Sequence, residues 1–347
     1  MGASAWLRER IPIDVGELGK AVNEPVPNHL KRWWFALGGT PAYLFVVQIV
    51  TGVLLAFYYQ PSQATAYESV RYITDEAAYG WYFRSVHKWA ASGMIAAVVL
   101  HQMRVYFTCS FRKPRELNWM VGMTLLIATL LTGFTGYSLV YEQLSYWGAS
   151  VGANIADAVP VVGSVMKKAM LGGDAYGPRA LSRFFVLHTA VLPATIVLLV
   201  VVHIAMVRIQ GVTELRFEDE KDDAPKHFKF FPDHLATELI LGLSLMIVLS
   251  ALAVLFPAAM GPKADPLVTP EVIKPEWFFY VAFRWLKLFS GTVAVLSMGF
   301  VVFTMYLWPF IDAFVRKRFS RDLTVTVGSI AVVAIVGLTV WEAVVAH

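Results

Sequence analysis

The fold is decided by the stretches RSVHKWAASGMIAAVVLH (84–101) and LHTAVLPATIVLLVVVH (187–203), because each carries two histidines within an apolar segment. These are His87 and His101 in the first stretch and His188 and His203 in the second. Spacings of 14 and 15 residues, at about 100° per residue, return to nearly the same face of an α-helix and separate the rings by about 21–23 Å. We therefore expect each stretch to be a helix with one histidine near each end.

Seven stretches are long and apolar enough to cross a bilayer, whose core of about 30 Å needs about 20 helical residues. In chain order they are 36–59, 85–107, 119–141, 184–207, 239–262, 288–311 and 323–341. The second is included although Lys88 and Arg104 lie near its ends, because long basic side chains there can reach the membrane surface. We predict an all-α integral membrane protein of seven transmembrane helices, a four-helix bundle followed by three further helices.

The composition excludes several other classes of protein. With 57% hydrophobic and 16% charged residues, against about 25% charged in soluble domains, this is no water-soluble enzyme. A net charge of +4 is too small to indicate a nucleic-acid binder. The single cysteine, Cys109, excludes an internal disulfide, a CxxCH haem attachment and a cysteine-ligated iron–sulfur cluster in this chain.

Basic residues predict the direction of the chain. If the N-terminus is cytoplasmic, two basic connections lie inside, as the positive-inside rule prefers. They contain Arg112, Lys113 and Arg115, and Arg316, Lys317, Arg318 and Arg321. The long connections 142–183 and 263–287 then lie outside, where their length indicates a function. The charged N-terminal 32 residues lack an apolar core, so no cleavable signal peptide is expected.

The histidine-bearing helices cross the bilayer in the same direction, because one predicted span separates them. His87 then lies level with His188, and His101 level with His203. Two axial imidazoles with no cysteine nearby suit a six-coordinate b-type haem, which transfers electrons and has no open position for a substrate. The sequence therefore predicts two stacked haem sites. Two alternatives stay open: histidines hydrogen-bonded within a packed core, and a channel or proton relay.

Small and basic residues recur at the heights of the histidines. Gly38 and Gly52, like Gly122 and Gly136, are 14 residues apart. Missing side chains let a flat macrocycle approach the backbone, although glycines also let two helices pack closely. Basic residues near the histidines suit haem propionates, although membrane-surface anchors look the same. These residues are Arg84, Lys88, Arg104 and Arg208.

On these features the chain resembles cytochrome b, the core subunit of bc1- and b6f-type quinol oxidoreductases. The specific elements are the histidine spacings and the segments RSVHKW (84–89), FRKPREL (111–117), TGYSL (135–139) and RIQG (208–211). Residues 1–215 resemble the di-haem bundle of cytochrome b6. Residues 216–347 resemble subunit IV, through DPLVTP (265–270) and KPEWFF (274–279). This fusion suggests a bacterial protein of the cytoplasmic membrane.

The resemblance implies two non-covalent b-type haems, a low-potential haem on His87 and His188 outside and a high-potential haem on His101 and His203 inside. It also implies quinol oxidation at an outer site and quinone reduction at an inner site, coupled to proton translocation. The implied partners are a Rieske-type iron–sulfur protein, a c-type cytochrome subunit, membrane lipid and a second copy of the complex in a homodimer.

Two carboxylates are candidates for proton transfer at the quinone sites. Glu276 lies between Pro275 and Trp277, and a carboxylate in aromatic, poorly solvated surroundings can have a raised pKa and shuttle a proton. The resemblance implies that Glu276 takes a proton from quinol at the outer site. Glu238 resembles the acidic residue of the inner quinone site.

Three positions depart from the family pattern. Phe278 replaces the tyrosine that follows Pro-Glu-Trp, and Val140-Tyr141 replaces a Pro-Trp pair. Both changes fall at the outer quinone site. Ala36 replaces the cysteine that tethers an extra haem in cytochrome b6, so no covalent c-type haem is expected.

The leading hypothesis is a di-haem cytochrome b subunit that oxidises quinol outside and reduces quinone inside. The altered outer pocket motivates an alternative, a b-haem membrane anchor that links the quinone pool to another dehydrogenase or reductase without bifurcation. A channel or transporter without haem is the third.

Overall fold

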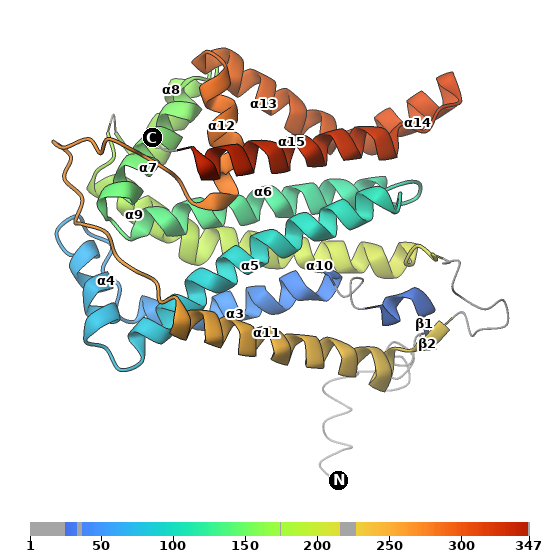
Figure 1. The fold of residues 1–347 in the computed structure, drawn as a ribbon, viewed down its shortest axis with the longest axis horizontal. Coiled ribbons are helices and arrows are strands. Elements are labelled where there is room, and N and C mark those ends of the chain that lie inside the picture. The colour runs from blue at the N-terminus through green and yellow to red at the C-terminus, as the bar shows by residue number, and fades with distance from the viewer. Residues whose placement is uncertain (1–24, 33–36, 174, 216–226, 346–347) are drawn as a thin grey trace, which may run out of the picture.

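The computed structural model describes residues 25–32, 37–173, 175–215 and 227–345, which are almost entirely helical (Figure 1). The first half contains α3 (Gly39–Ala56), α4 (Ala66–Asp75), α5 (Gly80–Phe107), α6 (Glu116–Leu139), α7 (Gln143–Asp157), α8 (Gly163–Leu171), α9 (Pro178–Val186) and α10 (Leu192–Gln210). The second half contains α11 (Leu235–Leu255), α12 (Tyr280–Leu288), α13 (Gly291–Tyr306), α14 (Trp308–Phe319) and α15 (Thr324–Val344). Two short strands, β1 (Pro25–Pro27) and β2 (His227–Lys229), pair antiparallel.

Among the described residues, five helical segments are long and apolar enough to cross a membrane. They are Gly39–Ala56, Glu116–Leu139, Pro178–Gln210, Phe230–Leu255 and Thr324–Val344. The pair α13 and α14 passes the same test as one broken span, which gives up to six. The 28-residue helix α5 runs alongside them in Figure 1 but carries three basic residues. The helical membrane fold is confirmed, and the number seven stays a prediction that counts α5 as a span.

Stretch 288–311 was expected to be one helix, and that expectation is wrong. Helix α13 ends at Tyr306, and α14 continues beyond Leu307 at an angle of 70°. Pro309 explains the break, because it lacks the N–H that would bond to the carbonyl four residues earlier and its ring clashes with that carbonyl. The carbonyl of Met305 instead accepts a hydrogen bond of 2.9 Å from the Trp119 indole.

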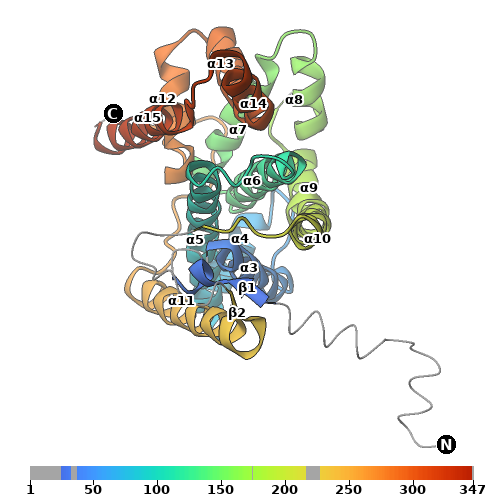
Figure 2. The same cartoon turned by 90° about the vertical axis from the view of Figure 1, so that its right-hand side faces the viewer.

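A bundle of α3, α5, α6 and α10 forms the centre of the molecule. Helix α5 packs against α3 and α6, and α6 packs against α10. Helix α11 covers one side of this bundle, against α5 and α3, while α12 to α15 lie on the other side (Figure 2). The last three predicted spans therefore do not pack as one unit. The division into residues 1–215 and 216–347 stays a prediction about sequence relationships.

The two long connections are ordered against the same end of the bundle. Residues 142–183 form α7, α8 and the start of α9. The connection 256–279 passes from α11 to α12 across the ends of helices in the first half (Figure 1). The Trp89 indole donates to the carbonyl of Phe256 at 2.8 Å, and the Tyr67 hydroxyl donates to that of Gly261 at 2.9 Å. These bonds tie the second half of the chain to the first.

Candidate functional site

The four histidines of the apolar stretches are half-buried and form two pairs between α5 and the segment that contains α9 and α10. The ring centroids of His87 and His188 are 6.2 Å apart, and those of His101 and His203 are 6.4 Å apart. The ring planes are inclined at 73° and 76°. The structure thus brings together the pairs that the sequence predicted to lie at the same height.

The geometry of each pair fits a metal between the rings. Two metal–nitrogen bonds of about 2 Å and two imidazole radii of about 1.1 Å add up to about 6.2 Å, close to both centroid separations. Each pair supplies two ligands, and the described residues contain no cluster of three or more His, Cys, Asp or Glu side chains that could hold a bare ion. A metal here would need its other ligands from a macrocycle, as haem iron has.

Hydrogen bonds orient two of the rings so that Nε2 is left for the partner helix. His87 Nδ1 lies 2.8 Å from the Thr51 hydroxyl, and His188 Nδ1 lies 3.0 Å from the Thr132 carbonyl and 3.3 Å from the Thr135 hydroxyl. Metal-binding histidines commonly donate their other ring N–H to such acceptors, which fixes the tautomer. The orientation of His87 and His188 is therefore compatible with a bis-histidine site.

A π-helical turn, Leu187–Val191, joins α9 to α10 and contains His188. Such a turn bonds residue i to i+5 and so takes up one residue more than an α-helical turn. The 15-residue step from His188 to His203 then behaves as about 14 α-helical steps, which matches the 14-residue step on α5. Fifteen regular α-helical steps would offset the two rings by about +60°, whereas 14 steps offset them by about −40°, the offset expected on α5.

Each histidine ring faces one glycine. Two of these glycines belong to α6, one to α3, and one, Gly38, directly precedes α3. A Cβ atom built on Gly52 would lie 3.3 Å from His87 Cε1, and one built on Gly136 would lie 2.5 Å from His188 Cε1. A Cβ atom built on Gly38 would lie 3.9 Å from His101 Cε1, and one built on Gly122 would lie 3.8 Å from His203 Cε1. Side chains at these positions would occupy space directly beside the rings. The four glycines therefore leave space beside the rings, and their role in accommodating a flat macrocycle stays a prediction.

Arg84 and Lys88, the basic residues beside His87, contact other parts of the same chain. The Arg84 guanidinium donates to the carbonyls of Ala258 at 2.6 Å and Ala259 at 3.1 Å, in the connection between α11 and α12. Lys88 Nζ lies 3.4 Å from Glu276 Oε1. The expected contact of these residues with haem propionates stays a prediction.

The inner basic residues differ in their partners. Arg104 Nη2 lies 3.1 Å from His101 Nδ1. Because a guanidinium only donates, Nδ1 is the acceptor and the ring proton lies on Nε2, the atom that would bind iron. Haem binding would thus require Arg104 to change partner and His101 to change tautomer. The Arg208 guanidinium stacks 5.2 Å from the centre of the Phe230 ring.

The Pro-Glu-Trp segment (Pro275–Trp277) contacts Lys88, the residue that follows His87 on α5. Glu276 has 26% of its side chain exposed and pairs with this lysine, so it is less enclosed than its aromatic neighbours suggested. Pro275 precedes it, and the Trp277 indole donates to the Ser92 hydroxyl of α5 at 3.4 Å. The predicted outer-site residues therefore lie against the haem-site helix α5.

The positions that depart from the family pattern have different surroundings. The Phe278 ring lies 3.4 Å from a Cβ built on Gly133 of α6, and Tyr280 faces Lys274 at 5.2 Å. Tyr141 is buried, adopts a left-handed backbone conformation (φ 57°) and stacks on Tyr176. Ala36 lies outside the described residues.

The candidate inner quinone residue Glu238 lies beside the inner histidine pair. Its carboxylate contacts Gly39, whose neighbour Gly38 faces His101. His234 Nε2 lies 3.8 Å from Glu238 Oε1, one helical turn away. A carboxylate and an imidazole that can both carry protons thus meet near the inner pair.

Three residues of these sites were not singled out from the sequence. Thr51 and Thr135 bond to the outer histidines, and Tyr137 interacts electrostatically with Glu276. A signal was present, because Thr51 precedes Gly52 and Thr135 precedes Gly136. The repeated Thr-Gly pair places a hydrogen-bond acceptor beside each gap for a ring.

Comparisons with known proteins agree with this arrangement. A family model described as cytochrome b/b6/petB matches residues 21–211, and one described as cytochrome b(C-terminal)/b6/petD matches residues 263–346. Cytochrome b6 of Heliomicrobium gestii is 46% identical over 210 residues, which are 60% of this chain and 98% of that protein.

Two further relatives extend over most of the chain. The cytochrome bc complex cytochrome b subunit of Chlorobaculum thiosulfatiphilum is 35% identical over 316 residues, 89% of this chain and 73% of that protein. A chain in a solved structure titled "Hyperthermophilic respiratory Complex III" has a TM-score of 0.85 and 26% identity, and the match covers 99% of this chain and 92% of that chain.

Proposed function

The chain belongs to the cytochrome b/b6 family, and from this premise we propose that it is the di-haem subunit through which a bc- or b6f-type complex oxidises quinol outside and reduces quinone inside. The comparisons also confirm the expected fusion of cytochrome b6-like and subunit IV-like parts in one chain. Quinone chemistry, haem binding and proton translocation are the parts that we propose.

The proposal rests on one observation: the histidines form two pairs, and each ring faces a glycine. When bound, haem supplies one-electron redox chemistry, which links an outer to an inner quinone site. The chain supplies axial imidazoles, the gaps beside them and an apolar surrounding. His87 and His188 would hold the outer group, and His101 and His203 the inner one.

At the outer site, Glu276 acts as proton acceptor. Its carboxylate oxygens accept the proton of a quinol hydroxyl, and Lys88, 3.4 Å away, stabilises the ionised carboxylate before that transfer. Trp277 and Phe278 provide aromatic walls for a quinol ring against α5 and α6. At the inner site, Glu238 and His234 supply protons to a reduced quinone.

Quinol turnover in a Glu276→Gln variant tests this proposal. We expect the purified complex to keep its haem but to reduce an external c-type cytochrome with quinol about a hundredfold more slowly, because a proton acceptor at the reacting group is lost. Glu271→Gln is the matched control, since Glu271 is an exposed carboxylate of the same connection. Unchanged turnover in Glu276→Gln would favour the alternative below.

The alternative is a b-haem anchor that passes electrons between the quinone pool and another enzyme without bifurcation. It is favoured by Phe278, which places a ring without a hydroxyl against Gly133 in the outer pocket. The main proposal also includes two partners, a Rieske-type iron–sulfur protein and a c-type cytochrome, and a homodimer of complexes. It further includes a cytoplasmic N-terminus and the absence of a covalent c-type haem.

A further inference from the structure

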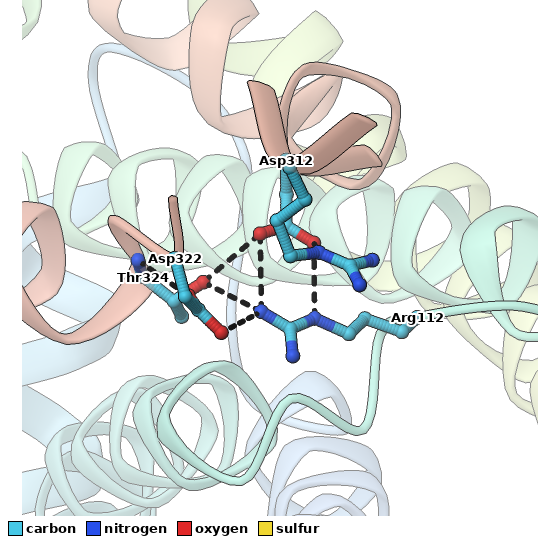
Figure 3. Close-up of polar contacts among 5 residues, drawn as sticks. Arg112, Asp312, Asp322 and Thr324 are labelled. Atoms are coloured by element: carbon cyan, nitrogen blue, oxygen red, sulfur yellow. Dashed lines mark hydrogen bonds and ion pairs between the residues drawn. The ribbon is translucent and has the colours of Figure 1, made fainter. Parts of the chain in front are cut away.

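Helix α14 is fixed to the rest of the molecule by a buried ionic cluster on one face (Figure 3). Asp312, only 3% exposed, accepts hydrogen bonds from Arg112 Nε at 2.9 Å and from the Thr324 hydroxyl at 3.1 Å. Arg112 Nη2 also donates to Asp322 at 2.6 Å. The cluster joins the connection between α5 and α6 to α14, to the α14–α15 connection and to the first residue of α15. These contacts fix which face of α14 is turned toward the rest of the molecule.

The opposite face of α14 carries an exposed aromatic stripe. Phe310 and Phe314 lie two residues before and after Asp312, so each projects about 160° away from it. Their side chains are 47% and 64% exposed. Lys317 follows at about 140° from Asp312, close to the same line. Helix α14 turns 70° away from α13 and diverges from the bundle (Figure 1).

Basic charge is concentrated beside this stripe. Lys317, Arg318 and Arg321 are exposed, and none of them takes part in an ion pair within the described part of the chain. The nearest carboxylates, Asp312 and Asp322, are engaged by Arg112. The surface thus has aromatic side chains next to surplus positive charge.

We propose that the face of α14 formed by Phe310, Phe314, Lys317 and Arg318, with neighbouring Arg321, binds an anionic phospholipid. Aromatic and basic residues on one helical face suit the border between acyl chains and headgroups. Basic side chains reach from that depth to acidic headgroups while their stems stay in contact with apolar material. The surface is separate from the histidine pairs and from both proposed quinone sites.

Native mass spectrometry of the purified complex tests this proposal. The probes are short-chain phosphatidylglycerol and the matched phosphatidylcholine. We expect phosphatidylglycerol to bind more tightly to the wild type, and the triple variant Lys317→Gln, Arg318→Gln and Arg321→Gln to weaken its binding about tenfold or more, because three surface charges are lost. Glutamine preserves helix propensity, and the single variant Lys317→Gln serves if the triple variant is unstable.

The control variant removes three basic residues at the other end of the molecule: Arg71→Gln, Lys168→Gln and Arg179→Gln. It should bind phosphatidylglycerol as the wild type does, and Phe314→Ser should weaken binding of both lipids. The proposal is overturned if the triple variant binds as the wild type does, if the control loses as much affinity, or if inorganic phosphate displaces the lipid. It is also overturned if another subunit covers α14 and no lipid binds.

Discussion

At position 136 the absence of a side chain determines how closely α6 approaches a histidine ring. A Cβ at Gly136 would lie 2.5 Å from His188 Cε1, a contact that requires the ring to move. We predict that Gly136→Ala lowers the haem content from two to about one per chain, because the displaced imidazole no longer faces His87. Haem quantitation of the purified variant measures this.

Gly337→Ala is the matched control, because a Cβ at Gly337 has nothing within 4 Å. It should retain the haem content of the wild type. Full haem content in Gly136→Ala would show that the glycine serves helix packing alone, which was the simpler interpretation of these glycines in the sequence.

Asp322 gives a second prediction at the residue scale. The hydrogen bond from Arg112 lowers the pKa of Asp322 from 3.8 to about 2. The folded state therefore favours the ionised carboxylate, and the resulting stability is present above about pH 4 and is lost as the pH falls toward 2. We expect the melting temperature of Asp322→Asn to lie slightly below that of the wild type at pH 6, since Asp322 is half exposed, and this difference to shrink below pH 4.

Thermal melts of the detergent-solubilised protein at several pH values provide the measurement. Glu76→Gln, which removes an exposed carboxylate just after α4, should show no such convergence. A difference between Asp322→Asn and the wild type that persists unchanged to pH 2 would contradict the assignment.

At the scale of an element, the π-helical turn sets the phase of the second histidine helix. Deleting Ala190 should restore regular α-helix with a 14-residue step between the histidines and so keep their phase, whereas inserting one alanine after Ala190 should rotate one histidine by about 100° relative to the other. We predict that the deletion keeps both haems and that the insertion removes one. Spectroscopic haem counts of the two variants would decide it, and loss of a haem in the deletion variant would contradict this role of the turn.

The elements show how far the sequence can be interpreted. Histidine spacing, apolar length and the 14-residue glycine spacings predict the bundle and its pairs, because helical periodicity is local. The π turn and the 70° bend were not predicted. A π turn carries no strong local signal, whereas the bend follows from Pro309, whose effect was overlooked inside an apolar stretch. The hydrogen bond between Arg104 and His101 joins residues three apart on α5, but it depends on the rotamers of both side chains, which the spacing alone does not give.

At the scale of the whole molecule, the second half of the chain surrounds the first. Helix α11 and helices α12 to α15 lie on opposite sides of the bundle, joined by a connection that crosses its outer end (Figure 2). The sequence indicated that this connection was long but not that it divides the second half. The same connection brings Glu276 to Lys88, so the proposed outer quinone site exists only when both halves are assembled.

The account depends on two histidine pairs that each hold one haem. A reduced-minus-oxidised optical spectrum with haem quantitation per chain tests this most directly, on the wild type and on His188→Leu and His101→Leu. We predict two b-type haems per chain in the wild type and about one in each variant. No protohaem in the wild type, or an unchanged haem count in both variants, would contradict the account.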